Sequence, residues 1–143
     1  MRLVNSWTMR HIKNLLGPKT LFSFSLLYTL LITIVALSER SGLPEILWWE
    51  YQDKLAHLFA YVVLGCAWGL TWLYFRKIDF WKPYFVVLVS SSLVYGTIVE
   101  VLQLTTTTSR TADFWDVVAN TIGVILGVVI AWYGYHKWLT IKN

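Results

Sequence analysis

Four long apolar stretches divide this chain and constrain its fold more than any other feature. They cover residues 20–37, 55–75, 84–104 and 117–135, with short polar segments between them. At about 1.5 Å per helical residue, the shortest stretch extends roughly 27 Å, close to the thickness of the hydrocarbon core of a bilayer. A hydrophobic content of 57% also exceeds that of an ordinary soluble domain. We therefore predict an all-α integral membrane four-helix bundle that forms a single domain over residues 1–143.

The basic residues predict how the bundle is oriented in the membrane. Nine of the 12 Lys and Arg residues precede the first apolar stretch, separate the second from the third, or follow the fourth. Seven of the eight Asp and Glu residues lie at the opposite ends of the stretches. Short loops rich in Lys and Arg stay in the cytoplasm, so we predict that both termini are cytoplasmic. The net charge of +4 then reflects topology and anionic lipid, and we expect no nucleic-acid partner.

The N-terminal region has two interpretations. Residues 3–16 place apolar side chains on one helical face and basic ones on the other, which is typical of an interfacial amphipathic helix. The alternative is an unstructured basic tail that only sets the topology. The first stretch ends with Ala36 and Ser38, a weak cleavage pattern, but its apolar run is longer than that of a usual signal peptide. We predict an uncleaved membrane anchor.

Small residues recur every four positions in the last three stretches. Such spacing lets helix backbones approach closely in lipid, so we predict that these three helices form a compact bundle. No internal repeat is visible in the sequence, which weakens a transporter hypothesis. The small residues are Gly65 and Gly69 in the second stretch, Ser92 and Gly96 in the third, and Ala119, Gly123, Gly127 and Ala131 in the fourth.

Ionisable and amide side chains gather at the acidic ends of the stretches. They recur at intervals of three or four residues, so each set shares a helix face. With alternating topology, every set reaches the outer leaflet, and the sets can converge on one extracytoplasmic site. Their members are Asp53, Lys54 and His57 at the start of the second stretch, Glu100 and Gln103 at the end of the third, and Arg110, Asp113, Asp116 and Asn120 around the start of the fourth.

Glu100 is the residue that local structure explains least. It lies near the C-terminal end of its predicted helix, where the helix dipole disfavours a negative charge, and about one turn inside the apolar stretch. An ionisable residue at membrane depth costs roughly 2.5 to 3.5 kcal/mol unless it is paired. We predict Arg110 as its first partner, with Lys54 or His57 next. A purely structural pair of Glu100 and Arg110 is the alternative to a functional role.

The other polar residues also have structural explanations. Asp53, Asp113 and Asp116 could each cap or neutralise a helix N-terminus. Lys54 could extend its ammonium group to the membrane interface. Asn120 could form a hydrogen bond within the bundle. These residues therefore support a site only as a group.

His57 could carry a proton, ligate a metal or form a hydrogen bond within the bundle. With the neighbouring carboxylates it offers the ligand types of a divalent metal site, although no compact ligand motif is present. A divalent metal is therefore a candidate cofactor of unknown identity. Its candidate ligands are Asp53, His57, Glu100, Asp113 and Asp116.

Three segments resemble the VanZ-like family of bacterial membrane proteins. They are DKLAHLFAYVVLG (53–65), EVLQ (100–103) and RTADFWDVVANTIGVILG (110–127), and their order is more specific than any one of them. The resemblance implies a multi-pass cell-envelope protein of the bacterial inner (cytoplasmic) membrane. It also implies a relation to glycopeptide resistance, since the family is named after a member linked to teicoplanin. The polar positions that it carries over are Asp53, His57, Glu100, Gln103, Arg110, Asp116 and Asn120.

Two functions are consistent with the polar residues. The first is an enzyme that acts on the phosphate headgroup of a membrane lipid or lipid-linked envelope precursor, with His57, Glu100 and Asp116 as catalytic residues. The second is a non-catalytic protein that binds an envelope glycolipid, or serves as an accessory protein, through the same polar face. The oligomeric state stays open. In the first hypothesis the substrate-binding residues are Lys54, Gln103, Arg110 and Asn120.

Overall fold

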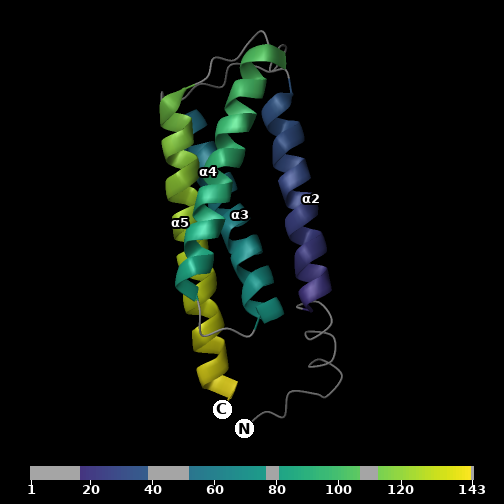
Figure 1. Cartoon of the computed structure of the whole chain (residues 1–143), viewed down its shortest axis with the longest axis vertical. Helices are drawn as coiled ribbons and strands as arrows, with labels where there is room; N and C mark the ends of the chain where they lie inside the picture. The colour runs from purple at the N-terminus through teal and green to yellow at the C-terminus, as the bar shows by residue number, and fades with distance from the viewer. Residues whose placement is uncertain (1–16, 39–51, 77–80, 107–112, 143) are drawn as a thin grey trace.

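A computed structural model of the chain describes residues 17–38, 52–76, 81–106 and 113–142, and nearly all of them are α-helical. The helices are α2 (Pro18–Leu37), α3 (Gln52–Arg76), α4 (Trp81–Thr106) and α5 (Phe114–Lys142). They run alternately up and down, so α2 begins at the end of the bundle where α5 finishes (Figure 1). The predicted N-terminal amphipathic helix lies outside the described residues, and the cytoplasmic placement of the termini stays a prediction.

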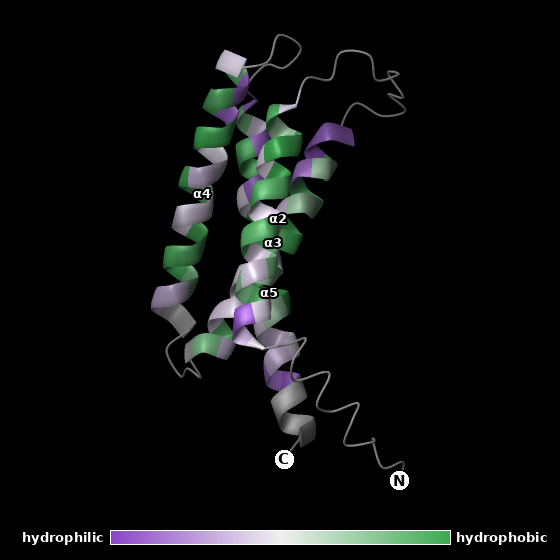
Figure 2. Cartoon of the chain, turned by 90° about the vertical axis from the view of Figure 1, so that its right-hand side faces the viewer, coloured by the Kyte–Doolittle hydropathy of each residue, from purple (hydrophilic) through white to green (hydrophobic). Residues whose placement is uncertain are grey.

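All four helices are long and apolar enough to cross a membrane. This confirms the predicted all-α, multi-pass architecture. Large apolar side chains cover the outside of the bundle, and Leu27, Ile34 and Phe59 are each 65% exposed. Extensive exposed apolar surface is expected where a protein meets lipid. Figure 2 shows hydrophobic segments along the helices and hydrophilic segments mainly toward their ends.

The helices extend beyond the apolar stretches that predicted them. The second and fourth apolar stretches begin at residues 55 and 117, whereas α3 begins at Gln52 and α5 begins at Phe114. The apolar run marks only the part of a helix that suits lipid, while backbone hydrogen bonding continues into polar turns. Asp53, Lys54 and Asp116 therefore lie in the first turns of helices.

Helices α3 and α5 form the closest pair in the bundle. They run in the same direction, and glycines bring their backbones into contact. A Cβ atom at Gly65 would lie 2.6 Å from the Val124 carbonyl oxygen, and one at Gly123 would lie 2.5 Å from the Leu58 carbonyl oxygen. These contacts leave no room for a side chain, as the small-residue spacing predicted. They also fix the first turn of α3 beside that of α5.

Hydrogen bonds from polar side chains help to attach helix α2 to the rest of the bundle. The hydroxyls of Ser25 and Thr71 lie 2.8 Å apart and share a hydrogen bond between α2 and α3. Tyr28 donates a hydrogen bond of 3.0 Å to the Ala60 carbonyl oxygen, also across α2 and α3. Such bonds between helices help to hold a bundle together in lipid, where little hydrophobic driving force acts.

Helices α3 and α4 are in much weaker contact, which the prediction of a compact α3–α4–α5 bundle did not foresee. α4 packs instead against α5, and it reaches α2 through a hydrogen bond of 2.7 Å between the hydroxyls of Tyr95 and Thr33. The glycine contacts hold α3 on α5, so bulkier side chains separate it from α4. This separation leaves space for a pocket between α2, α3 and α4.

Candidate functional site

The polar residues predicted from the sequence meet at one end of the bundle, where α3 and α5 begin and α4 ends (Figure 1). Three potential ligand atoms, one each from Asp53, His57 and Asp116, all lie within 4.8 Å of one another. Asp53 and His57 are one turn apart on α3, and Asp116 comes from the facing turn of α5. The close contact of these two helices therefore assembles the cluster.

His57 is oriented by a neighbour on α5. Its Nδ1 atom lies 3.2 Å from Oδ1 of Asn120, whose side chain is only 2% exposed. An amide oxygen accepts hydrogen bonds but cannot donate them, so Nδ1 carries the proton. The lone pair of the neutral ring is then on Nε2, which lies 3.9 Å from Oδ2 of Asp116. His57 thus directs an electron-pair donor toward the carboxylate cluster.

Gly96 on α4 makes room for this arrangement. A Cβ atom at that position would lie 3.3 Å from Nδ2 of Asn120 and 3.4 Å from the hydroxyl of Tyr61. The prediction explained Gly96 as part of a packing face. Its neighbours show that it also allows α4 to approach the side chain that orients His57.

Lys54 and Asp113 form an ion pair beside the cluster. The Lys54 ammonium donates to Oδ2 of Asp113 at 2.6 Å and lies 4.0 Å from Oδ1 of Asp116. Asp113 also caps α5, because its Oδ1 accepts a hydrogen bond of 2.9 Å from the Trp115 backbone N–H. The hydrogen bonds from Lys54 and Trp115 hold the pKa of the Asp113 carboxyl below its usual value. The capping explanation therefore fits Asp113, while the Asp116 side chain turns inward.

We predict that replacing Asp113 by Asn removes part of the acid sensitivity of the fold. A lowered carboxyl pKa stabilises the folded state at any pH above the ordinary Asp pKa of about 3.9, and this contribution disappears as the pH falls through the lowered value. The thermal midpoints of the wild type and of Asp113→Asn should differ most above pH 4 and converge in more acidic solution. A constant difference between pH 7 and pH 3 would contradict the assignment.

The cluster opens into a pocket of about 230 Å³ between α2, α3 and α4. Asp53, His57, Glu100 and Asn120 form its polar end. The rest of its wall is mostly apolar or aromatic and extends along the membrane-spanning parts of the helices. This part is lined by Tyr28, Leu31, Ile32, Val35, Ala36, Ala56, Ala60, Tyr61, Tyr95 and Val99.

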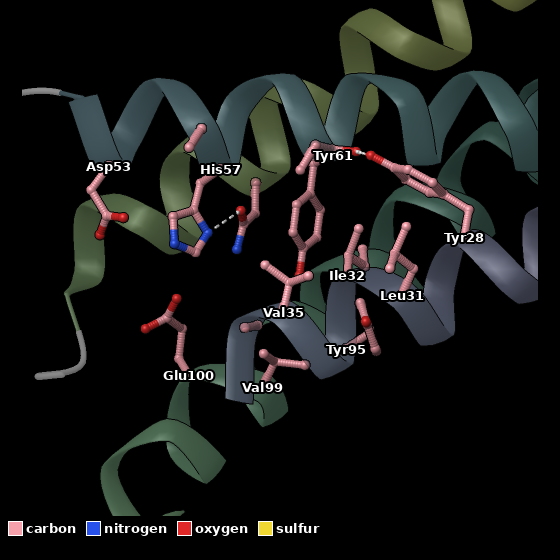
Figure 3. Close-up of a pocket in the computed structure, with 14 residues that line it drawn as sticks. Tyr28, Leu31, Ile32, Val35, Asp53, His57, Tyr61, Tyr95, Val99 and Glu100 are labelled. Atoms are coloured by element: carbon pink, nitrogen blue, oxygen red, sulfur yellow. Dashed lines mark hydrogen bonds between the residues drawn. The ribbon is translucent and has the colours of Figure 1, made fainter. Parts of the chain in front are cut away.

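Glu100 faces the cluster from the opposite side of the pocket. Figure 3 shows its carboxylate, on α4, pointing toward Asp53 and His57 on α3. The residue is 4% exposed, although it belongs to a helix whose neighbouring Val101 is 55% exposed to the outside. The pocket therefore has a carboxylate on each side, that of Asp53 from α3 and that of Glu100 from α4.

Gln103, a predicted substrate-binding residue, lies at the edge of the pocket. Gln103 is 2% exposed, and its Nε2 donates a hydrogen bond of 2.8 Å to the Ala36 carbonyl oxygen near the end of α2. It joins α4 to α2 at the edge of the pocket and does not form part of the pocket wall. Arg110, the predicted partner of Glu100, lies outside the described residues.

The sequence prediction missed the tyrosines of the pocket. Tyr61 lies one turn after His57 on the same face of α3, so spacing alone could have indicated it. Tyr28 and Tyr95 come from α2 and α4, and no spacing rule connects them to the polar residues. Only the tertiary structure reveals that they form its wall.

A sequence model of the VanZ/LLP1 family matches residues 3–138. The chain belongs to this family. The match contains all four helices up to residue 138 of α5, and so every described residue of the cluster and the pocket. The resemblance seen in three short segments is thus confirmed over most of this VanZ/LLP1 chain. Comparisons with curated proteins and with solved structures found no match.

Proposed function

We propose that this VanZ/LLP1 protein is a membrane enzyme that acts on the phosphate headgroup of a membrane lipid or lipid-linked envelope precursor. The observation that carries the proposal is the two-part pocket. One end holds Asp53, His57, Glu100 and Asn120, and the other part is an apolar wall at membrane depth. A molecule that fits both parts is amphipathic, with a polar headgroup and a hydrocarbon chain.

The apolar part has room for a hydrocarbon chain. A second cavity of about 350 Å³ also has Tyr95 in its wall and continues toward the end of α3, lined by Leu64, Trp68 and Leu88 among others. Both cavities lie between α2, α3 and α4. A chain bound along this seam would extend past Tyr95 into the second cavity.

The polar end offers groups that suit phosphate chemistry. Lys54 supplies a cation beside the cluster, and its side chain keeps 31% of its surface exposed. Hydrogen bonds from such a cation to phosphate oxygens are among the strong ones in proteins. We assign Arg110 the same task, as the sequence spacing suggested. Asn120 positions His57 and borders the pocket, so its amide would contribute mainly to orientation.

The reaction that these residues suit best is hydrolysis of a phosphate ester. A water oxygen adds to phosphorus while the P–O bond to the lipid breaks. Glu100 accepts a proton from the water, and a proton returns to the leaving oxygen, so the products are the lipid alcohol and inorganic phosphate. Glu100 is suited to this task because it faces the cluster from across the pocket, where a headgroup would lie between them (Figure 3). His57 would orient the headgroup from the other side, with Asp116 behind it at 3.9 Å from its Nε2 atom.

The predicted orientation places this chemistry at the outer leaflet. The Lys and Arg distribution assigns the ends of the helices with few basic residues to the extracytoplasmic side. The cluster lies at those ends. We therefore propose that the protein works on the outer face of the bacterial cytoplasmic membrane, where envelope precursors are exposed.

A bulky substitution in the apolar wall tests the proposal. Leu31 lines the pocket and Leu30 does not, although they are adjacent on α2 and are 54% and 51% exposed. Overfilling a packed space costs about 1 to 3 kcal/mol, so Leu31→Trp should weaken lipid binding by roughly tenfold or more. Leu30→Trp should bind as the wild type does. Native mass spectrometry in nanodiscs containing phosphatidic acid or a long-chain polyprenyl phosphate would measure the bound lipid.

Release of inorganic phosphate from the same nanodiscs distinguishes the two functions. Turnover by the wild type, reduced in Leu31→Trp and retained in Leu30→Trp, would support the enzyme. Binding that is selective for Leu30→Trp over Leu31→Trp, without turnover of either lipid, would favour the non-catalytic glycolipid-binding or accessory function. Equal binding to both variants would contradict the pocket assignment.

A further inference from the structure

The donor atoms of the cluster are arranged as a metal site would need. The potential ligand atoms of Asp53, His57 and Asp116 lie within 4.8 Å of one another, and the Nε2 to Oδ2 distance between His57 and Asp116 is 3.9 Å. Metal to ligand bonds of about 2.0 to 2.2 Å place neighbouring ligand atoms roughly 3 to 4 Å apart. Small side-chain movements would therefore bring all three atoms to one ion.

The hydrogen bond between His57 and Asn120 prepares the imidazole for this role. Metal-binding histidines usually donate their other ring N–H to a fixed acceptor, which sets both the tautomer and the ring orientation. Here Nδ1 donates to the buried Asn120 oxygen at 3.2 Å, and Nε2 faces Asp116 with its lone pair. A histidine that served only to pack the helices would not need its free nitrogen directed at a carboxylate.

Asp116 provides an independent observation that favours a cation site. The residue is 5% exposed, and its buried Oδ1 accepts no hydrogen bond from any residue that the structure describes. Among the described residues, the Lys54 ammonium lies 4.0 Å from this oxygen and donates its hydrogen bond to Asp113 instead. A buried carboxylate oxygen without a hydrogen bond is costly, and a directly bound cation removes that cost.

The proposed substrate adds a further reason, and this step alone rests on the proposed function. A phosphate headgroup in the pocket would face the carboxylates of Asp53 and Glu100, with Asp116 next to Asp53, and all three have the same sign of charge as the phosphate. Lys54 balances only part of this charge. A divalent ion between the carboxylates and the headgroup would convert the repulsion into attraction.

We propose that Asp53, Nε2 of His57 and Asp116 bind one divalent transition-metal ion at the polar end of the pocket. One imidazole and two carboxylates suit Mn²⁺, Fe²⁺ or Zn²⁺ better than Mg²⁺ or Ca²⁺, which prefer oxygen ligands alone. Three protein ligands leave coordination positions for water or a phosphate oxygen on the pocket side. The assignment gives Nε2 of His57 to the metal and leaves proton transfer to Glu100.

Mn²⁺ binding to the full chain tests this site directly. The purified protein is treated with a chelator, returned to nanodiscs and titrated with MnCl₂, while electron paramagnetic resonance measures free Mn²⁺. We expect one tightly bound ion per chain. Pulsed electron paramagnetic resonance should detect coupling between the Mn²⁺ electron spin and the directly bonded His57 nitrogen. Asp116→Asn and His57→Gln should each weaken binding at least about 100-fold, and His57→Gln should also abolish the nitrogen coupling.

Two further variants keep the test decisive if a ligand variant folds poorly. Asn120→Ala keeps all three ligands, so it should still bind one ion, but with an affinity about 10 to 100-fold lower. Asp113→Asn removes a neighbouring carboxylate that is paired with Lys54 and is not one of the three proposed ligands, so it should lower Mn²⁺ affinity much less than Asp116→Asn does.

No Mn²⁺ binding by the wild type, or an equal loss in Asp113→Asn and Asp116→Asn, would overturn the site. The proposal of a metal site and the proposal of a lipid enzyme can also be refuted independently of each other. Mn²⁺ binding without turnover of either lipid would contradict the enzyme and leave the site standing. Turnover that persists without any bound divalent ion would contradict the site and leave the enzyme standing.

Discussion

Replacing Glu100 by Gln is expected to reduce phosphate release at least about 100-fold, because proton transfer by a positioned side chain typically contributes a factor of that size or more. Gln has nearly the same shape as Glu but cannot accept the proton of the attacking water. Glu100 is 4% exposed and faces Asp53 and His57 across the pocket (Figure 3). Release of inorganic phosphate from lipid nanodiscs would measure the effect, with lipid binding measured in parallel.

The conservative variant Glu100→Asp separates catalysis from recognition. It keeps the negative charge but withdraws the carboxylate by about one C–C bond, roughly 1.5 Å. An enzyme that needs the proton acceptor at a fixed distance should lose most of its turnover, whereas a protein that only recognises charge should tolerate the change. Both variants should keep their lipid binding within a small factor. Full turnover in Glu100→Gln would refute the assignment of Glu100 as the proton acceptor.

Replacing Gly127 by Ala is expected to destabilise the bundle by about 1 to 3 kcal/mol or more, the usual cost of overfilling a packed interior. The added Cβ would collide with the Val62 carbonyl oxygen and lie 2.8 Å from the Cys66 backbone nitrogen and 3.0 Å from the Gly65 Cα atom. All three are backbone atoms of α3, so the contact can be relieved only by moving the two helices apart. Unfolding in mixed detergent micelles, followed by circular dichroism, would measure the loss.

Gly134 provides a matched control on the same helix. The same single methyl group at this position would have no neighbour within 4 Å among the described residues. Gly134→Ala should therefore leave the stability unchanged or raise it by up to about 1 kcal/mol, because alanine is favoured over glycine inside a helix. Gly127 belongs to the contact between α3, which carries His57, and α5, which carries Asp116. Gly127→Ala should therefore also weaken Mn²⁺ binding. Similar stability in the two variants would contradict the close α3–α5 contact.

Helix positions and the end of the bundle that carries polar residues could be predicted from the sequence because both depend on local patterns. Apolar runs located all four helices, and alternation of direction brought Asp53, Glu100 and Asp116 to the same end. The helices extend beyond the predicted spans, because backbone hydrogen bonding continues into polar turns that lie outside an apolar run. Small-residue spacing predicted close packing, but the same spacing in three helices could not identify α3 and α5 as the closest pair.

The partners of the polar side chains could not be predicted in this way. Lys54 and Arg110 were both reasonable partners for Glu100 by spacing, yet Lys54 pairs with Asp113. His57 had three alternative roles, and the position of Asn120 on the neighbouring helix set its tautomer. Differences of a few ångströms decide such pairings, and spacing along one helix does not fix the distance to the next.

By itself, the sequence determined a four-helix membrane protein of the VanZ/LLP1 family with its ionisable residues at one end. These properties follow from hydropathy, helical period and motif order, all of which depend only on the order of residues in the sequence. The tertiary structure alone decided that the polar end opens into an apolar pocket. Its wall combines Tyr28 of α2, Tyr61 of α3 and Tyr95 of α4. The pocket exists because glycine contacts hold α3 against α5 and leave α4 apart from α3. Such packing depends on segments that are distant in the sequence, so the sequence pattern alone does not reveal it.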